Sequence, residues 1–420
     1  TEWGGMQNFL NMDASHSRLK ETWDAMTLMI SHSNEVLKLG NDLPDADKPI
    51  LAEARFWRAF AYYRLYNVFG PIPLNLGDKD ISQGIERATD DQIRTFIETE
   101  MNAVEAILPN TYSKEDYGRP TKWAVKSFLS RYYLNKKDWA LASRYAKEII
   151  DNNEFSLEAN YQDVFGRNQN SEVILAINHI KELDKGNKYV ALSLVSSLSE
   201  ALGITGVSGS NGYGMAVGFY RTFDPADKRI EPYNPITRKG IAIAGVIIKK
   251  DGTPLYGTVA TPKTVEQELN RVITCKWPVV IDIPRGEDAP LDCPIYRLGE
   301  TYLTYAEAQS ELRNTAEAMT YINKVRSRAG LTDISLGGKT QEQVREIILN
   351  ERGWELYHEG FRREDLVRHG KLLEKVNEKY KFYHGTDLPW KNDQNRLLLL
   401  FPTGAMQLNP KLTQNPSYQK

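Results

Sequence analysis

Hydrophobic residues recur at helical spacing through most of the first 160 residues of the chain. A long amphipathic stretch at 18–40 ends at Gly40, a natural position for a glycine just beyond a helix C-terminus. The stretch 49–70 begins with a proline and ends with a glycine. A third stretch, 89–109, begins at a candidate N-cap threonine and ends at a proline. The pattern predicts three successive helices.

Two later regions have the pattern of paired helices. In 121–152, two periodic segments flank the polar turn NKKD, and small residues such as Ala142 and Ala146 fall where helices pack closely. Residues 300–331 repeat this arrangement, again with tyrosines and alanines in packing positions. Each region resembles a tetratricopeptide helix pair. Such pairs need neighbours to cover their apolar faces, so we expect the flanking segments to stack on them.

The pattern changes between residues 160 and 295. The runs 171–178, 241–250 and 272–281 are typical of short β-strands, whereas 203–214 is rich in glycine. The sequence therefore predicts a mainly α fold. We expect a tetratricopeptide-like superhelix of helix pairs, with a loop-rich insertion that contains a few short strands.

The same pattern predicts how the chain is organised. We expect one unit over residues 1–420, without a boundary between separate domains. Its parts would be a helical frame at 18–160 and 296–375, a loop-rich and ligand-facing insertion at 161–295, and a loop-rich tail at 376–420.

Composition narrows the function classes. The 420 residues carry a formal net charge of −2 and no polybasic run, which argues against binding to nucleic acid or to a membrane surface. The longest apolar runs, such as 397–401, are too short to span a bilayer. The N-terminus has no signal-peptide pattern, although such a peptide could have been removed. Two cysteines, Cys275 and Cys293, permit one disulfide and do not decide the compartment.

The stretch ERGWELYHEGFRREDLVRHG at 351–370 raises the question of catalysis. On a helix, Glu351, Glu355 and Glu359 would share one face. Two carboxylates at this spacing suggest a glycosidase pair, but such pairs usually come from separate elements that converge on a cleft. The alternative is an ion-paired helical joint, in which nearby arginines pair with the acids. We favour this interpretation, with four arginines as the expected partners: Arg352, Arg362, Arg363 and Arg368.

Metal and cofactor sites are not predicted. His358 is followed by a glutamate but lacks a second histidine four residues on, so the zinc-protease spacing is absent. The loops contain no calcium-binding run of the EF-hand type.

Four segments in order resemble the SusD/RagB family of outer-membrane nutrient-binding lipoproteins. They are AEARFWRAFAYYRLYNVFGPIPL at 52–74, YRLGETYLTYAEA with INKVRSRAGL at 296–331, ERGWELYHEGFRREDLVRHGK at 351–371, and FPTGAMQLNPKLTQNPSY at 401–418. The resemblance covers the helical frame from end to end. It implies a tetratricopeptide-type frame, no enzymatic activity, and partnership with a SusC-like TonB-dependent outer-membrane transporter, over which the protein would trap oligosaccharide or, in some members, peptide.

The resemblance also implies a location. Members are surface-exposed at the cell outer membrane and lipid-anchored in the precursor. The chain begins at what resembles the family's first internal helix, so the anchor is expected from the family alone.

Ligand residues are expected on loops, because a sugar ring has an apolar face and a rim of hydroxyls. Such a site needs an exposed aromatic ring and short polar side chains on a rigid frame. The candidates are Trp3, Asn8, Tyr213, Trp277, Trp390 and Asn392. The alternation around Trp277 also allows it to face the core.

Two other functions stay open at this point. The chain could be a tetratricopeptide scaffold that binds peptide or protein on its concave face. It could also be a glycoside hydrolase that uses Glu351 and Glu355.

Overall fold

The computed structural model describes residues 13–41, 43, 47–179, 186–193, 214–231, 246–248, 254–256, 274, 276–278 and 289–418. The chain forms two compact units. The first comprises Thr1–Tyr112, Arg119–Phe128 and Arg363–Lys420, and the second comprises Ser113–Gly118 and Leu129–Arg362. The boundaries of these two units do not coincide with those of the predicted frame, insertion and tail. The predicted division therefore stays a prediction.

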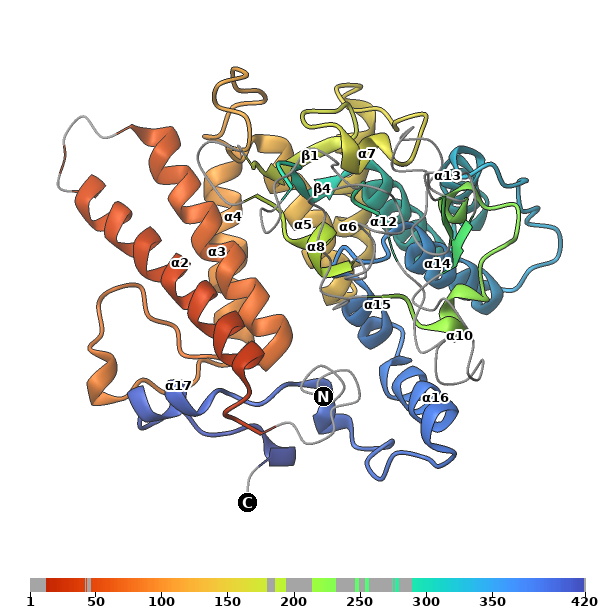
Figure 1. Cartoon of the computed structure of the whole chain (residues 1–420). Coiled ribbons are helices and arrows are strands. Elements are labelled where there is room, and N and C mark those ends of the chain that lie inside the picture. The colour runs from red at the N-terminus through yellow and green to blue at the C-terminus, as the bar shows by residue number, and fades with distance from the viewer. Residues whose placement is uncertain are drawn as a thin grey trace. The chain divides into compact units, whose positions relative to one another are not determined.

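Three long helices form the first unit, as the periodicity predicts. They are α2 (Ser17–Asn41), α3 (Lys48–Phe69) and α4 (Asp90–Glu105), and Figure 1 shows α3 alongside both of its neighbours. The cap residues explain two of the boundaries. Thr89 and Gln92 form a reciprocal capping box at the start of α4. At the end of α3, Gly70 has a φ of 74°, a conformation that glycine adopts without strain.

The C-terminal tail of the first unit is an ordered series of short helices and turns. It contains α15 (Arg362–Arg368, of which the first residue belongs to the other unit), α16 (Leu372–His384), η3 (Gln394–Leu397), α17 (Thr403–Leu408) and η4 (Pro416–Tyr418). Asparagine side chains hold it in place. Asn415 is fully buried, and its Nδ2 donates to the carbonyl oxygens of Phe69 and Leu399, at 3.0 and 2.7 Å.

Replacement of Asn415 by alanine is expected to lower the free energy of unfolding by about 1–3 kcal/mol, because it leaves buried carbonyl groups without a donor. Urea denaturation followed by circular dichroism measures the change. Asn102→Ala is the control, since this exposed asparagine on α4 should change stability by less than about 0.5 kcal/mol. Equal stability of the two variants would contradict a fastening role for Asn415.

The second unit is built on helix pairs. Helix α12 (Leu298–Glu311) contacts α6 (Trp139–Asp151), α13 (Thr315–Arg328) and α14 (Gln341–Glu355). Small residues such as Ala146, Ala306 and Ala318 are fully buried at these contacts, which lets the helices approach closely. The predicted pairing at 300–331 is therefore confirmed, with α12 and α13 as its two members.

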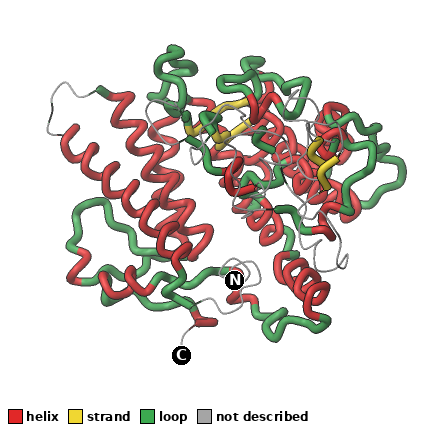
Figure 2. Tube along the Cα trace, in the orientation of Figure 1, coloured by secondary structure: helices red, strands yellow, loops and turns green. Residues whose placement is uncertain are grey.

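Strands are few and short, as Figure 2 shows. In the second unit, β1 (Val173–Ile177) pairs antiparallel with β4 (Cys293–Arg297), and β2 (Val246–Ile248) pairs antiparallel with β3 (Pro254–Tyr256). The mainly α prediction with a few strands is confirmed. The strand expected at 272–281 is wrong for its described residues 274 and 276–278, which lie in bends and irregular structure.

Five further elements are single turns of helix: η1 (Ile81–Gln83), α7 (Asp163–Gly166), α8 (Tyr189–Ser193), α10 (Val217–Tyr220) and η2 (Lys228–Ile230). Helix α5 (Lys122–Lys136) is a full helix that begins in the first unit and ends in the second.

Candidate functional site

The candidate ligand residues fall into two groups. Trp3, Asn8 and Tyr213 lie outside the described residues. Trp277, Trp390 and Asn392 lie within them, and their surroundings differ.

Trp277 is a core residue. It is 4% exposed, its ring stacks on that of Tyr189 with centroids 4.4 Å apart, and the ring of Phe165 meets it edge-on at 5.2 Å. The indole Nε1 donates to the backbone oxygen of Asp292 at 3.2 Å. The ring is thus packed against other aromatic rings, and its polar atom is bonded. The expectation that Trp277 offers a ring to a sugar is corrected, because packing against other aromatic rings buries it.

Trp390 and Asn392 lie in a turn between α16 and η3 in the first unit. Trp390 is partly exposed, with the guanidinium of Arg396 5.6 Å from its ring centroid, and Asn392 is exposed. The neighbouring Asp393 fixes the turn. Its carboxylate accepts from the backbone nitrogen of Asn395 and from the hydroxyl of Ser417, the latter at 2.6 Å. The turn therefore combines an accessible indole with an exposed amide on a fastened backbone, as carbohydrate recognition requires.

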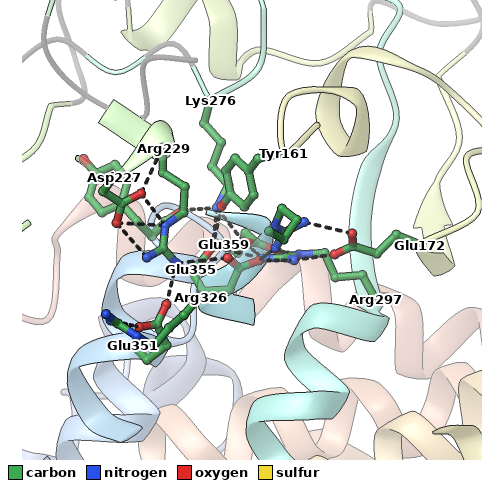
Figure 3. A network of polar contacts seen from close by, with 12 residues as sticks. Tyr161, Glu172, Asp227, Arg229, Lys276, Arg297, Arg326, Glu351, Glu355 and Glu359 are labelled. Carbon is green, nitrogen blue, oxygen red and sulfur yellow. Dashed lines mark hydrogen bonds and ion pairs between the residues drawn. The ribbon is translucent and has the colours of Figure 1, made fainter. Parts of the chain in front are cut away.

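The glutamates of the 351–370 stretch lie in a buried ion network in the second unit (Figure 3). Glu351 and Glu355 lie one turn apart on α14, which ends at Glu355, and Glu359 follows in a turn that contains His358 at a φ of 65°. The prediction that all three share one helix face is therefore wrong for Glu359. The prediction of ion pairing is confirmed for all three.

Arg297, at the end of β4, is the centre of this network. Its guanidinium bonds three carboxylates: Nη1 donates to Glu172 at 2.7 Å and to Glu355 at 2.6 Å, and Nε donates to Glu359 at 2.7 Å. Nη2 donates to the other oxygen of Glu359 and to the backbone oxygen of residue 355. Gly299 borders the cluster, and a Cβ at this position would clash with Arg297 and Glu172.

The network as a whole balances its charges. Its carboxylates are Glu172, Asp227, Glu351, Glu355 and Glu359, and its cations are Arg229, Arg297, Arg326, Arg328 and Lys276. Five charges of each sign offset one another, which makes the burial of ionised groups tolerable. Most of these cations are distant in sequence from the glutamates.

The arginines predicted as partners have other contacts. Arg352 lies 3.6 Å from Glu307, Arg368 pairs with Asp365 at 2.8 Å, and Arg362 and Arg363 donate to backbone oxygens. The cations that the structure shows on the three glutamates are Arg229, Arg297, Arg326, Arg328 and Lys276, which a helix pattern could not indicate because it reports local neighbours only.

The charges around Glu355 and Glu359 favour their ionised forms. Burial acts to raise the pKa of Glu355, but Arg328 and Arg297 outweigh it and lower that pKa well below its usual range. Burial likewise acts to raise the pKa of Glu359, and Arg297 and Lys276 together lower it. Both carboxylates are therefore held as anions in the folded state.

Burial prevails at two other members of the network. It raises the pKa of Glu351, although Arg229 opposes this shift. It lowers the pKa of Lys276 to about 8, against the opposing effect of Glu359. The network thus contains groups whose pKa values move in different directions.

This geometry does not suit hydrolysis. Glu351 and Glu355 are fully buried and each is bonded to guanidinium groups, so a glycosidic bond cannot reach them. In the part of the chain that the structure describes, no three His, Cys, Asp or Glu side chains are placed to hold a metal ion.

The first unit contains a hollow that the sequence did not predict. It has a volume of about 760 Å³ and is lined mainly by apolar side chains from α2, α3, α17 and the segment 72–85, including Trp23, Tyr62 and Leu65. Arg58 in its wall donates to the lining residue Asn34 and to Glu100, which lies outside the lining. Only the tertiary structure brings these elements together, and the apolar positions of α2 were the only indication in the sequence.

Helix pairs and a buried, charge-balanced joint define a protein of the helical-repeat class. Residues 120–418 match the model of the SusD family, and residues 3–134 match a model described as starch-binding and associating with the outer membrane. The chain belongs to the SusD family.

Relatives match along most of the chain. The SusD-like protein P25 of Formosa agariphila is 28% identical over 94% of this chain and 78% of its own length. The starch-binding protein SusD of Bacteroides thetaiotaomicron is 27% identical over 76% of this chain and 64% of its own length. A solved SusD homologue of Bacteroides thetaiotaomicron covers 96% of this chain and 87% of its own, with a TM-score of 0.78 at 19% identity, which shows the shared fold.

Among the described residues, none of the helices has the length and hydropathy that a bilayer span requires. Cys293, on β4, is partly buried, and burial raises the pKa of its thiol to about 12, which makes it a poor nucleophile at neutral pH. Cys275 lies outside the described residues.

Proposed function

We propose that this protein is a non-catalytic carbohydrate-binding protein that captures oligosaccharide or polysaccharide for uptake. Membership of the SusD family over residues 120–418 carries the proposal, and a starch-binding relative supports it. The buried, ion-paired state of Glu351 and Glu355 supports the absence of catalysis, because a glycoside hydrolase would need these two carboxylates accessible to its substrate.

The proposed site is a set of aromatic and amide side chains on loops. Trp390 and Asn392 are its members in the described part of the chain, while Trp3, Asn8 and Tyr213 stay candidates from the sequence alone. The indole of Trp390 would stack on the apolar face of a sugar ring, while the amide of Asn392 would bond hydroxyls at its rim. Trp277 has no part in this site, since its ring is buried.

The proposal extends to location and partner. The match of residues 3–134 to a model described as associating with the outer membrane supports an outer-membrane location. We propose in addition that the precursor is lipid-anchored and surface-exposed, and that the protein acts with a SusC-like TonB-dependent transporter. Affinity purification from an outer-membrane extract tests the partner: a co-purifying barrel of this kind is expected, whereas varied soluble proteins would contradict it.

Replacement of Trp390 by alanine is expected to weaken binding of a captured oligosaccharide about two- to tenfold, because one stacked ring contributes about 0.5–1.5 kcal/mol. Isothermal titration calorimetry of the full chain against a panel of oligosaccharides measures the change. Phe382→Ala is the matched control, since Phe382 is an exposed ring on α16 outside the proposed site, and it should bind as the wild type does. Wild-type affinity in both variants would remove Trp390 from the site.

A further inference from the structure

A second hollow lies in the second unit, on the surface of helix α13. Its volume is about 780 Å³, within the range of about 300–1,000 Å³ that small-molecule sites occupy. We call it the α13 groove. Its lining comes from the loop 155–157, from α12, from α13 and from the loop 333–336, and comprises Phe155, Ser156, Leu157, Tyr302, Ala316, Met319, Thr320, Asn323, Lys324, Ser327, Asp333, Ile334 and Leu336.

Tyr302 supplies a partly exposed aromatic ring whose orientation is set in advance by its packing against the core. The ring of Tyr321 meets it edge-on with centroids 5.2 Å apart at 75°. The ammonium of Lys324 lies 5.3 Å from the Tyr302 ring and 4.1 Å from that of Tyr321. A ring held by such contacts loses little conformational freedom when a ligand stacks on it. The sequence had placed this tyrosine among the packing residues of a helix pair.

The loop 333–336, which also lines the groove, is held in place. The side chain of Asn323 accepts from the backbone nitrogen of Ile334 at 2.9 Å and donates to its backbone oxygen at 3.2 Å. These two bonds fasten the loop 333–336 to α13. The groove is therefore bounded by a held ring and a held loop.

The rim offers short polar groups that suit hydroxyl ligands. The hydroxyl of Ser327 and the carboxylate of Asp333 are exposed at the groove, and neither makes a hydrogen bond to the rest of the described chain. An apolar ring bordered by such groups is the combination that a sugar needs, because its C–H face stacks and its hydroxyls bond the rim.

The charges of the groove select a neutral ligand. Lys324 and Asp333 are its only charged lining residues, and they offset each other. Acidic sugars are bound best by the planar fork of arginine. The arginines of α13 instead turn to the buried network, where Arg326 bonds Glu351 and Arg328 bonds Glu172.

From these observations we infer that the α13 groove is a binding subsite for neutral oligosaccharide, with Tyr302 as the stacking ring. The inference rests on the proposed carbohydrate-binding function and assigns to it a second site, in the second unit and separate from Trp390.

Titration of the full chain with maltoheptaose, laminarihexaose, cellohexaose and the acidic hexagalacturonate tests the inference. Ser327→Trp should block the groove and weaken binding of the neutral sugar at least about tenfold, since residue 327 is exposed and the change leaves the core intact. Tyr302→Ala should weaken it about two- to tenfold through loss of one stacked ring. Asn102→Trp, on an exposed position of α4, is the matched control and should bind as the wild type does. Circular dichroism confirms that each variant is folded.

The outcomes separate this inference from the proposed function. If the wild type binds a neutral sugar, Trp390→Ala weakens it, and both groove variants bind normally, the groove is not a subsite while carbohydrate capture stands. Binding of hexagalacturonate alone would overturn the neutral specificity. A wild type that binds none of the four sugars would overturn the proposed function and the groove assignment with it.

Discussion

Replacement of Arg297 by methionine is expected to lower the free energy of unfolding by about 3–5 kcal/mol. Methionine keeps much of the side-chain volume but removes a guanidinium that bonds Glu172, Glu355 and Glu359. These carboxylates are at most 2% exposed and would be left in the interior with one cation fewer than anions. Breaking a buried pair by removing one partner is costly for this reason, whereas the intact pair contributes less than its geometry suggests.

Urea denaturation, followed by circular dichroism at neutral pH, measures this loss. Arg144→Ala is the matched control, because the ion pair of Arg144 with Glu148 is exposed on α6, and its removal should cost no more than about 1 kcal/mol. Comparable stability of the two variants would show that the buried network does not hold the second unit together.

The network also connects separate parts of the second unit. Through Arg229 and Lys276, the network ties two segments of the predicted insertion to the glutamates at the end of α14. Arg326 and Arg328 add the last turns of α13. One cluster thus fastens loop segments to the helix pairs of the second unit.

Acid is expected to destabilise the protein as pH falls below about 4.5, through Glu355 and Glu359. Burial acts to raise the pKa of both carboxylates. The nearby arginines and, for Glu359, Lys276 outweigh burial and lower each folded-state pKa below the ordinary value of 4.5. Below that value the unfolded chain binds protons that the folded chain does not, so the equilibrium moves toward unfolding. The stabilisation is complete above pH 4.5 and is lost as pH falls through the folded-state values. Glu351 has a raised pKa and opposes this trend in part.

The free energy of unfolding at pH 7, 5, 4 and 3 tests this dependence. Glu355→Gln should be less stable at pH 7 and should show a shallower fall toward pH 3, because one of the responsible carboxylates is absent. Glu342→Gln is the control, since the Glu342 side chain is 77% exposed beside Arg345 on α14 and its loss should leave the slope nearly unchanged. An identical slope in wild type and Glu355→Gln would assign the acid sensitivity to other groups.

Local features of the fold could be predicted because their causes are local. The helices around 18–40, 49–70 and 89–109 follow from apolar spacing, from a capping box and from a glycine that accepts a positive φ. The pairing of α12 with α13 follows from small residues on facing turns. In the run 272–281 the described residues 274 and 276–278 form no strand, and Trp277 among them packs against other aromatic rings.

The candidate site was less predictable, because accessibility is a property of the folded chain. Trp277 and Trp390 look alike in sequence, each beside a lysine. Folding buries the first against Tyr189 and leaves the second partly exposed on a fastened turn. Similarly, Tyr302 has the spacing of a packing residue, and only the approach of the loops 155–157 and 333–336 makes its ring a wall of a groove.

The sequence by itself determined the helices, their pairing, the family and the pairing of the glutamates with cations. Tertiary structure alone decided which cations these are: Arg229 meets Glu351 across 122 positions and Arg297 meets Glu172 across 125. The physical reason is one of range. Helix periodicity and caps report on neighbours within a few residues, whereas burial and ion pairing depend on which distant segments the folded chain brings together.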